Sequence, residues 1–196
     1  YKRQAEGFQR THDRKKYLLR MLVFALISEI PFNYLYYSSP VFPFHQNVMF
    51  TFFIALLLML GLEKVRSKGA GLYILAAVLS LPVGYFLGTI GMVDYYGSGV
   101  VTVLIFYLCR QIPHGWIGEV AGLAFLNCKL LGGMTIPLTL GSWTLEFPEQ
   151  GLALLALIPI WLYNGRQGAH NKAIQYACYA FYPAHMLILA LLRMYL

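Results

Sequence analysis

Seven apolar stretches follow one another along this chain, with only short connections between them. A helix rises about 1.5 Å per residue, so it needs about 20 apolar residues to cross a hydrocarbon core of about 30 Å. Hydrophobic residues make up 59% of the 196 residues and charged residues 12%, whereas soluble domains average about 45–50% and about 25%. We therefore predict an all-α fold, a polytopic transmembrane bundle of about seven crossings. It forms a single membrane domain over residues 1–196, with approximate spans at 18–37, 47–62, 70–90, 97–109, 118–140, 151–163 and 173–192.

Basic residues are confined to alternate connections of this predicted bundle. Lys and Arg gather before the first stretch and after the second, fourth and sixth, whereas the connections 38–46, 91–96 and 141–150 contain none. Lys and Arg are retained on the cytoplasmic side of membranes, so we expect the start of the chain and the basic connections to face the cytosol. Arg193 is the exception, because seven crossings place it outside. The net charge of +7 then indicates orientation rather than nucleic-acid binding.

Sequence motifs for other chemistries are missing. Cys109, Cys128 and Cys178 are odd in number and form no CxxC, so we predict neither a disulfide framework nor a metal site. The sequence contains no G-x-x-x-x-G-K-[ST] and no G-x-G-x-x-G, so nucleotide hydrolysis and dinucleotide binding have no support. The glycine pairs Gly84–Gly88 and Gly118–Gly122 have a spacing that permits close approach of helices.

Three ionisable side chains fall in the middle of apolar stretches. Glu29, Lys129 and His185 each lie 11 or 12 residues into a span, which places them roughly 16–18 Å deep. A charge near the bilayer centre costs about 2.5–3.5 kcal/mol, so it faces a partner or a cavity. We predict that these groups and Asn127 form one buried polar site. The alternatives are a structural Glu29–Lys129 ion pair and a neutral His185 that donates to a carbonyl freed by Pro183.

Other polar residues extend this interpretation. Tyr182 lies one helical turn from His185 and is placed to contact a substrate. The run Arg10–Arg20 is either an ordinary cytosolic anchor or a binding surface for a phosphorylated or acidic ligand. His45 is interpreted as a surface residue of an outer connection.

Several segments closely resemble, in order, the TraX family of integral membrane proteins. They are EGFQRTHDRKKYLLRMLVFALISEIPF (Glu6–Phe32), QNVMFTFFIALLLMLGL (Gln46–Leu62), DYYGSGVVTVLIFYLCR (Asp94–Arg110), YNGRQG (Tyr163–Gly168) and FYPAHMLILALL (Phe181–Leu192). The founding member is a conjugation protein that acetylates the amino terminus of a pilin subunit, and the family resembles multi-pass acyltransferases of envelope polymers. The resemblance implies a location in the bacterial cytoplasmic (inner) membrane.

Family members usually begin with further apolar helices, the first of which carries an Asp-His pair. This chain has YKRQA (Tyr1–Ala5) in that place, so we expect those helices to be missing from it. If the family's Asp-His pair is catalytic, His185 positions the substrate instead of acting as the base.

The resemblance implies an acyltransferase that moves an acetyl group from acetyl-CoA to an amine or hydroxyl of a pilin-like amino terminus or an envelope glycan. On this hypothesis His185 is the general base and Glu29 orients it. Four residues contact the oxyanion or the acceptor: Tyr182, Asn47, Lys129 and Asn127. Five bind the phosphates of CoA: Arg14, Lys15, Lys16, Arg20 and Arg110. The alternatives are a small proton-coupled transporter or channel, disfavoured by the lack of paired inverted halves, and a non-catalytic membrane scaffold.

Overall fold

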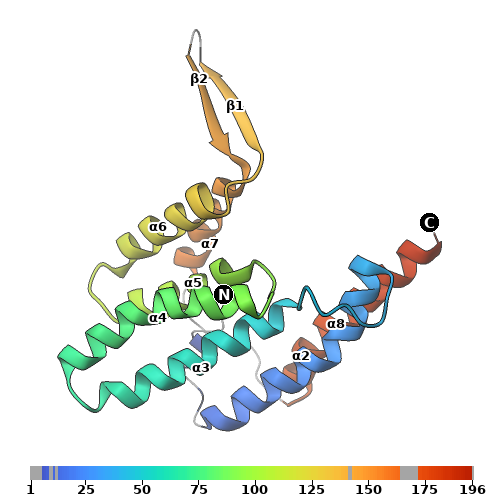
Figure 1. Cartoon of the computed structure of the whole chain (residues 1–196), viewed down its shortest axis with the longest axis horizontal. Helices are drawn as coiled ribbons and strands as arrows, with labels where there is room; N and C mark the ends of the chain where they lie inside the picture. The colour runs from blue at the N-terminus through green and yellow to red at the C-terminus, as the bar shows by residue number, and fades with distance from the viewer. Residues whose placement is uncertain (1–5, 9–10, 12, 141–142, 164–171, 196) are drawn as a thin grey trace.

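The computed structural model describes residues 6–8, 11, 13–140, 143–163 and 172–195. Its helical elements before the hairpin are α2 (Arg14–Tyr37), α3 (Val48–Arg66), α4 (Ala70–Ile90), α5 (Tyr96–Cys109), α6 (Gly115–Phe125) and the π-helix η1 (Leu126–Leu130). The strands β1 (Thr135–Leu140) and β2 (Trp143–Pro148) follow, and then the 3₁₀-helix η2 (Glu149–Ala156), α7 (Leu157–Leu162) and α8 (Lys172–Tyr195). The described chain is therefore mainly helical, with one antiparallel hairpin (Figure 1).

Helix α5 forms the centre of the bundle, although it is one of the shorter helices. Nearly all of its residues from Gly97 to Tyr107 are buried, and it packs against α3, α4 and α6. The contact with α4 brings two backbones together, since a Cβ atom at Gly88 would stand 2.8 Å from the Cα of Gly97. Gly118 and Gly122 of α6 face side chains of α5 in the same way. Both glycine pairs noted in the sequence therefore lie at helix contacts.

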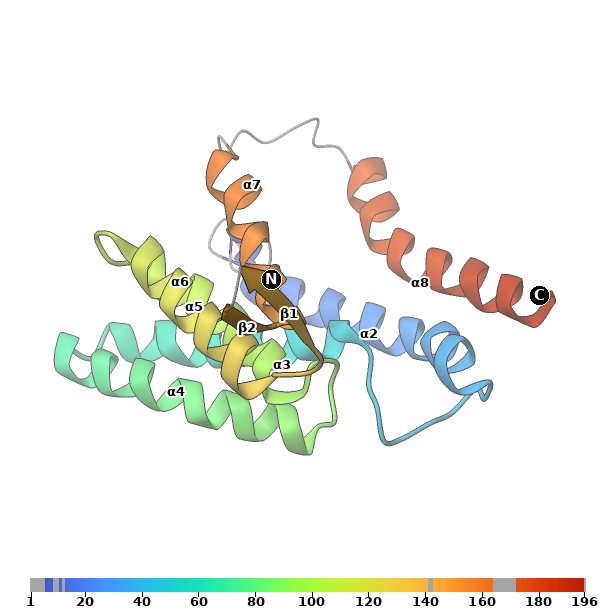
Figure 2. The ribbon, with the colours of Figure 1, turned by 90° about the horizontal axis from the view of Figure 1, so that it is seen from above.

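Helix α8 lies along α2 and runs in the same direction (Figure 2). The rings of Phe24 and Tyr179 stack with centroids 4.8 Å apart. Further along the pair, the guanidinium of Arg193 donates to the carbonyl of Leu35. These two contacts fix the register of α8 against α2.

Four helices of the described chain are long and apolar enough to cross a membrane, namely α2, α3, α4 and, over Tyr176–Met194, α8. Tyr96–Cys109 and Glu149–Leu162 are shorter apolar helices. All seven predicted stretches contain helix, so the helical, membrane-type character is confirmed. The number of crossings stays a prediction.

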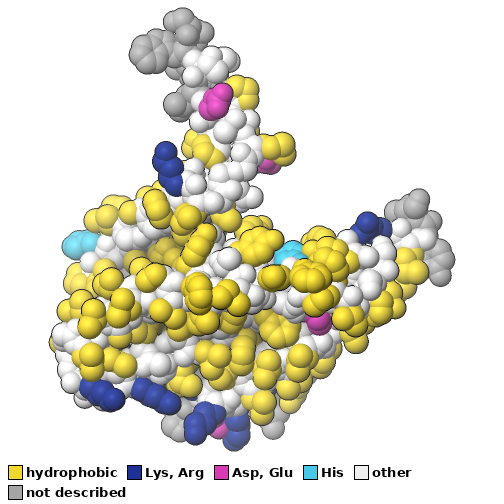
Figure 3. Space-filling model, viewed as in Figure 1, with side chains coloured by type: hydrophobic (Ala, Val, Ile, Leu, Met, Phe, Trp, Pro, Cys, Tyr) yellow, Lys and Arg dark blue, Asp and Glu magenta, His cyan; other side chains and the backbone are white. Residues whose placement is uncertain are grey.

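Apolar side chains dominate the outer surface of the long helices (Figure 3). On α4, for example, Ile74, Val78 and Phe86 are each more than 60% exposed. Lys and Arg gather along the lower edge of this view, where α2 begins and the α3–α4 turn lies. We call this edge the basic end. An apolar belt of this extent is typical of a surface that faces lipid.

The predicted helix over 118–140 is wrong in its second half. Helix α6 ends at Phe125, one π-helical turn follows, and the chain then leaves the helix. Gly132 and Gly133 take positive φ angles of 52° and 88°, which glycine adopts without steric cost. The following sequence TIPLTL is rich in β-branched residues and contains a proline, so it favours an extended edge strand over a helix.

We expect the substitution Gly97→Ala to destabilise the bundle. The added Cβ would overlap the carbonyl oxygen of Tyr85 and stand 2.7 Å from the Tyr85 Cα, so α4 and α5 would have to separate. Overpacking of this kind costs about 1–3 kcal/mol. Gly71→Ala is the matched control, because a Cβ there meets nothing within 4 Å. Thermal unfolding in detergent micelles measures both; equal melting temperatures for the two variants would contradict the α4–α5 packing.

Candidate functional site

Polar side chains gather where α2 ends, α3 begins and the α4–α5 connection turns. The two connections are pinned together, because the backbone N–H of Gln46 donates to the carbonyl of Met92 over 2.8 Å. This bond forms part of a bridge between Gln46 and Val93. We call the side chains gathered here the His45 cluster, which consists of Glu29, Tyr37, His45, Asn47 and Asp94.

Asn47 connects α3 to α2 at the base of this cluster. It is the N-cap of α3, and its side-chain oxygen accepts from the backbone N–H of Met49 over 3.0 Å. Its amide nitrogen donates to Glu29 Oε2 over 2.5 Å and to the Ala25 carbonyl over 2.9 Å. Asn47 is fully buried. The residue predicted to contact the acceptor therefore holds Glu29 in place.

One carboxylate oxygen of Glu29 accepts no hydrogen bond among the described residues. Its Oε1 atom is buried and has no hydrogen-bond partner among the described residues, and the same holds for Ser28 Oγ and Asn33 Oδ1 on the same helix. Ser28 and Asn33 are almost completely buried. Buried polar atoms normally find partners, and the exceptions require an explanation such as a bound group. These three oxygens can accept a hydrogen bond from a substrate.

His45 links Tyr37 to Asp94. Its Nδ1 atom lies 2.5 Å from the Tyr37 hydroxyl, and its Nε2 atom lies 3.7 Å from Asp94 Oδ1. With Nε2 protonated toward the carboxylate, Nδ1 accepts the hydrogen bond of Tyr37. Thr51 Oγ1 donates to the backbone carbonyl of Asp94 over 2.9 Å, which holds the connection against α3. Burial raises the pKa of Asp94, and the nearby His45 partly offsets this. A carboxylate, a histidine and a hydroxyl in series resemble the arrangement that activates a nucleophile.

Helix α8 brings Tyr182 to the same place. Tyr182 lies near Val48 at the start of α3, on the side of the bundle that holds Glu29 and Asp94. Tyr182 is partly buried against the core. The predicted role of Tyr182 at a polar site is therefore compatible with its position.

His185 lies at the level of Glu29 on the neighbouring helix. Glu29 follows Phe24 by five residues, His185 follows Tyr179 by six, and Phe24 stacks on Tyr179. The His185 ring packs edge-on against Tyr182 with centroids 5.4 Å apart. Its Nδ1 atom lies 2.8 Å from the Phe181 carbonyl, so Nδ1 is the donor and Nε2 is left as an acceptor. The structure describes no bond between His185 and Glu29.

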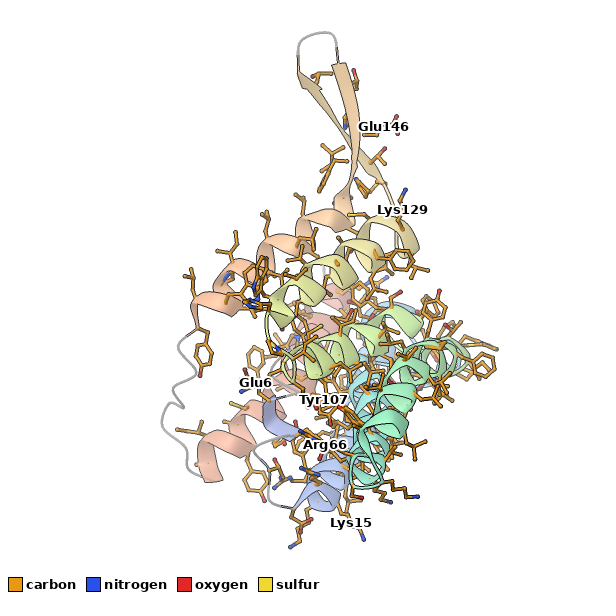
Figure 4. All side chains as sticks on the ribbon, turned by 90° about the vertical axis from the view of Figure 1, so that its left-hand side faces the viewer. Glu6, Lys15, Arg66, Tyr107, Lys129 and Glu146 are labelled. Carbon is orange, nitrogen blue, oxygen red and sulfur yellow. The ribbon has the colours of Figure 1, made fainter. Side chains whose placement is uncertain are left out.

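Lys129 and Asn127 lie elsewhere, on η1. Lys129 is exposed at the base of the hairpin (Figure 4), and no ion pair joins it to Glu29, although the structure describes both side chains. The reason is that η1 packs on α6, α5 and η2. Asn127 is buried and donates to the Leu123 carbonyl over 2.8 Å. It lines a separate cavity of about 280 Å³ between α5, η1, η2 and α7.

A second polar cluster lies at the basic end and was not predicted. Glu63 accepts from the Tyr107 hydroxyl over 2.5 Å and pairs with Arg14 at 3.4 Å and Arg66 at 3.8 Å. Figure 4 shows Tyr107, Arg66, Lys15 and Glu6 gathered far from the hairpin. Tyr107 is fully buried, so this cluster connects α3 and α5 to the start of α2.

The residues predicted to bind CoA phosphates differ in their surroundings at the basic end. Arg14 pairs with Glu63, Arg110 with Glu6 at 2.7 Å, and Lys16 with Asp13 at 3.1 Å. Lys15 is exposed, and the structure describes no ion pair for Lys15 or Arg20. The buried Arg20 Nε has no hydrogen-bond partner in the part of the chain that the structure describes.

His45, Asp94 and Tyr37 are functional candidates that sequence reasoning missed. His45 was interpreted as a surface residue of one connection, and Asp94, on another connection, was given no role. A signal was available, since the connections 38–46 and 91–96 were both predicted on the same side of the membrane. Residues on two connections of one side can meet, and here they do.

Apolar helices of membrane length with buried polar clusters define this chain as a protein of the integral membrane class. A family model described as TraX protein matches residues 4–193, nearly the whole chain, so the chain belongs to the TraX family. No curated protein and no solved structure matches it.

We expect the variant Asp94→Asn to change the pH dependence of stability. The folded-state pKa of Asp94 is raised, so the folded state holds the proton more tightly than the unfolded chain. The stability contributed by this group is present below the unfolded pKa of about 3.9 and is lost as the pH rises through the folded pKa. The melting temperature of D94N should therefore match the wild type in acid and exceed it near neutral pH. An unchanged difference across this range would contradict the burial of Asp94.

Proposed function

We propose that this chain forms part of a membrane-embedded acyltransferase that moves an acetyl group from acetyl-CoA to an amine or hydroxyl acceptor. The acceptor is a pilin-like amino terminus or an envelope glycan. The observation that carries the proposal is the Tyr37–His45–Asp94 series beside the unpartnered Glu29 Oε1. Acyl transfer needs a general base near neutral pH, and histidine is the side chain best suited to that task.

In this proposal His45 is the base. Asp94 fixes the Nε2–H tautomer and stabilises the imidazolium that forms. The acceptor gives its proton to the Tyr37 oxygen while Tyr37 passes its own proton to His45 Nδ1. The acceptor's lone pair forms a bond to the thioester carbonyl carbon. The tetrahedral oxyanion then collapses, the carbon–sulfur bond breaks, and the CoA thiolate leaves and takes up the proton from His45.

The surrounding groups bind and orient the reactants. The Glu29 Oε1 and Asn33 Oδ1 atoms, which lack partners, accept hydrogen bonds from the acceptor. The Tyr182 hydroxyl donates to the developing oxyanion. His185, at the level of Glu29, acts as a second histidine that positions the acceptor, or as the base itself as the sequence predicted.

The basic end supplies the contacts for CoA. Lys15 and Arg20 bind its phosphates, because neither is used in an ion pair among the described residues. Arg20 and Tyr37, the residue that takes the acceptor's proton, are 17 residues apart on α2, about 25 Å along the helix. The thioester at the end of the long flexible arm of CoA therefore has to reach deep into the bundle from the basic end.

The membrane arrangement that we propose has seven crossings, with the basic end in the cytosol of a bacterial inner membrane. The gathering of Lys and Arg at one edge supports the orientation. The parallel packing of α2 and α8 supports an odd number of crossings, because the first and seventh helices then run in the same direction. In this arrangement α6 with η1 and η2 with α7 form the two composite crossings.

The test of the base is acetyl transfer in membranes that contain the protein. We expect His45→Ala to lower kcat for transfer from acetyl-CoA to a peptide with a free amino terminus by about 10²–10⁴-fold, because the proton acceptor is removed. His114→Asn is the matched control, since His114 is exposed and Asn tolerates its φ of 55°.

Two further variants separate the candidates. Loss of activity in H185A with full activity in H45A would assign the base to His185. Full activity in both, at normal expression and with acetylation of the peptide shown by mass spectrometry, would overturn the proposed mechanism. Glu29→Gln should raise KM for the acceptor more than it lowers kcat.

The test of CoA binding is a double variant at the basic end. We expect Lys15→Ala with Arg20→Met to raise KM for acetyl-CoA by at least about 10²-fold with little change in kcat, because charge-assisted contacts to phosphate each contribute about 1.5–3 kcal/mol. Lys68→Ala is the control, an exposed cation of the α3–α4 turn. An unchanged KM in the double variant, measured by initial rates, would remove these two residues from the CoA site.

A further inference from the structure

The β1–β2 hairpin carries an apolar face. Cα register pairs position 136 with 147, 138 with 145 and 140 with 143. Paired positions share a face, and successive residues of a strand alternate between faces. The first face therefore holds six positions, all apolar in sequence: Ile136, Leu138, Leu140, Trp143, Leu145 and Phe147. The opposite face holds Thr135, Pro137, Thr139, Thr144, Glu146 and Pro148.

The rest of the described chain does not pack against most of this face. The hairpin projects from the helices (Figure 1), and beyond its own pairing it packs on η1 and η2 at its base. An isolated two-stranded hairpin is at best marginally stable in water and needs a hydrophobic surface against one face. Ile136 on the apolar face is exposed.

The surroundings of the hairpin favour lipid as that surface. Four residues, 131–134, separate it from η1, and η2 begins directly after β2, so the hairpin is tied closely to helices of the apolar belt. The apolar face continues into exposed apolar residues at the base, including Leu130 and Met134. Glu146 is the only charged residue between 131 and 148, and it lies on the opposite face.

The positive charge of Lys129 at the base of the hairpin also favours contact with lipid. Lys129 precedes the hairpin, is exposed, and lies on the same side of it as Glu146 in Figure 4. A lysine at this depth extends its ammonium toward lipid phosphates while its methylenes lie along apolar surface. Tryptophan, the residue type at position 143 where β2 begins, is enriched where membrane meets water.

We propose that the β1–β2 hairpin lies in the headgroup region of the bilayer, with its apolar face against the acyl chains and its Glu146 face toward water. This inference rests on the membrane placement proposed above. The hairpin is then a lipid-binding element, which anchors the composite crossings on either side of it.

The fluorescence of Trp143 in vesicles of brominated phosphatidylcholine tests this placement. The difference between the native chain and Trp143→Phe gives the emission of Trp143 alone. We expect the emission of Trp143 to have a short wavelength. We also expect it to be mostly quenched when the bromine atoms are attached near the headgroup end of the acyl chain. Unquenched emission at long wavelength would overturn the proposal and place Trp143 in water. Unquenched emission that depends on the protein-to-lipid ratio would overturn it in favour of contact with a second copy of the chain.

A matched pair of variants tests which face meets the lipid. Leu138→Lys places a charge on the apolar face and should reduce the quenching of Trp143 several-fold, whereas Thr139→Lys, on the neighbouring position of the other face, should leave it unchanged. Equal effects would overturn the assignment of faces.

The Trp143→Phe variant also separates this proposal from the one on which it rests. It retains Trp116 on α6 and Trp161 on α7, both exposed in the described chain. If bromine quenches these two and not Trp143, the hairpin proposal fails alone. If it quenches none of them, the membrane placement fails as well. The acetyl-transfer assay is a separate measurement, so it tests the proposed activity independently of the hairpin proposal and of the membrane placement.

Discussion

The hydrogen bond between Asn47 and Glu29 holds together the part of the molecule on which the candidate site depends. One amide caps α3, binds a carbonyl of α2 and orients a carboxylate in the middle of that helix. In a bundle whose outer surface is apolar, such bonds specify position, because apolar packing alone lets helices slide and rotate. With α3 fixed against α2, the connection that carries His45 lies where the imidazole meets Asp94.

The molecule has two polar ends with different organisation. At the basic end Glu63 is satisfied by Tyr107 and two arginines, so that cluster connects helices. Around His45, buried oxygens find no hydrogen-bond partner among the described residues, including Ser28 Oγ and Glu29 Oε1. Satisfied networks rigidify a fold, whereas unsatisfied buried groups cost stability and are retained where they bind something. This contrast is the physical reason to place function at His45 and structure at Glu63.

Much of the helical framework could be predicted from the sequence, because long apolar stretches in lipid have little choice but to form helices. The prediction failed over 118–140, where a short apolar run is compatible with either a helix or a strand, and where Gly132–Gly133 ends the helix. Site residues were predicted by depth. Depth grouped Glu29 with His185, which lie at one level, and also with Lys129, which lies on another side of the bundle.

The sequence by itself determined the membrane character, the approximate helices, the glycines that allow them to touch and the family. These follow from local composition and spacing, which act along the chain. The tertiary structure alone decided that His45 meets Asp94, since the two lie 49 residues apart on separate connections. It also decided that Asn47 binds Glu29 and that Lys129 lies apart from Glu29. Contacts between helices depend on how each helix is rotated about its axis and on which helices are its neighbours. A helix that faces lipid on most sides is apolar nearly all round, so its sequence pattern indicates neither of these.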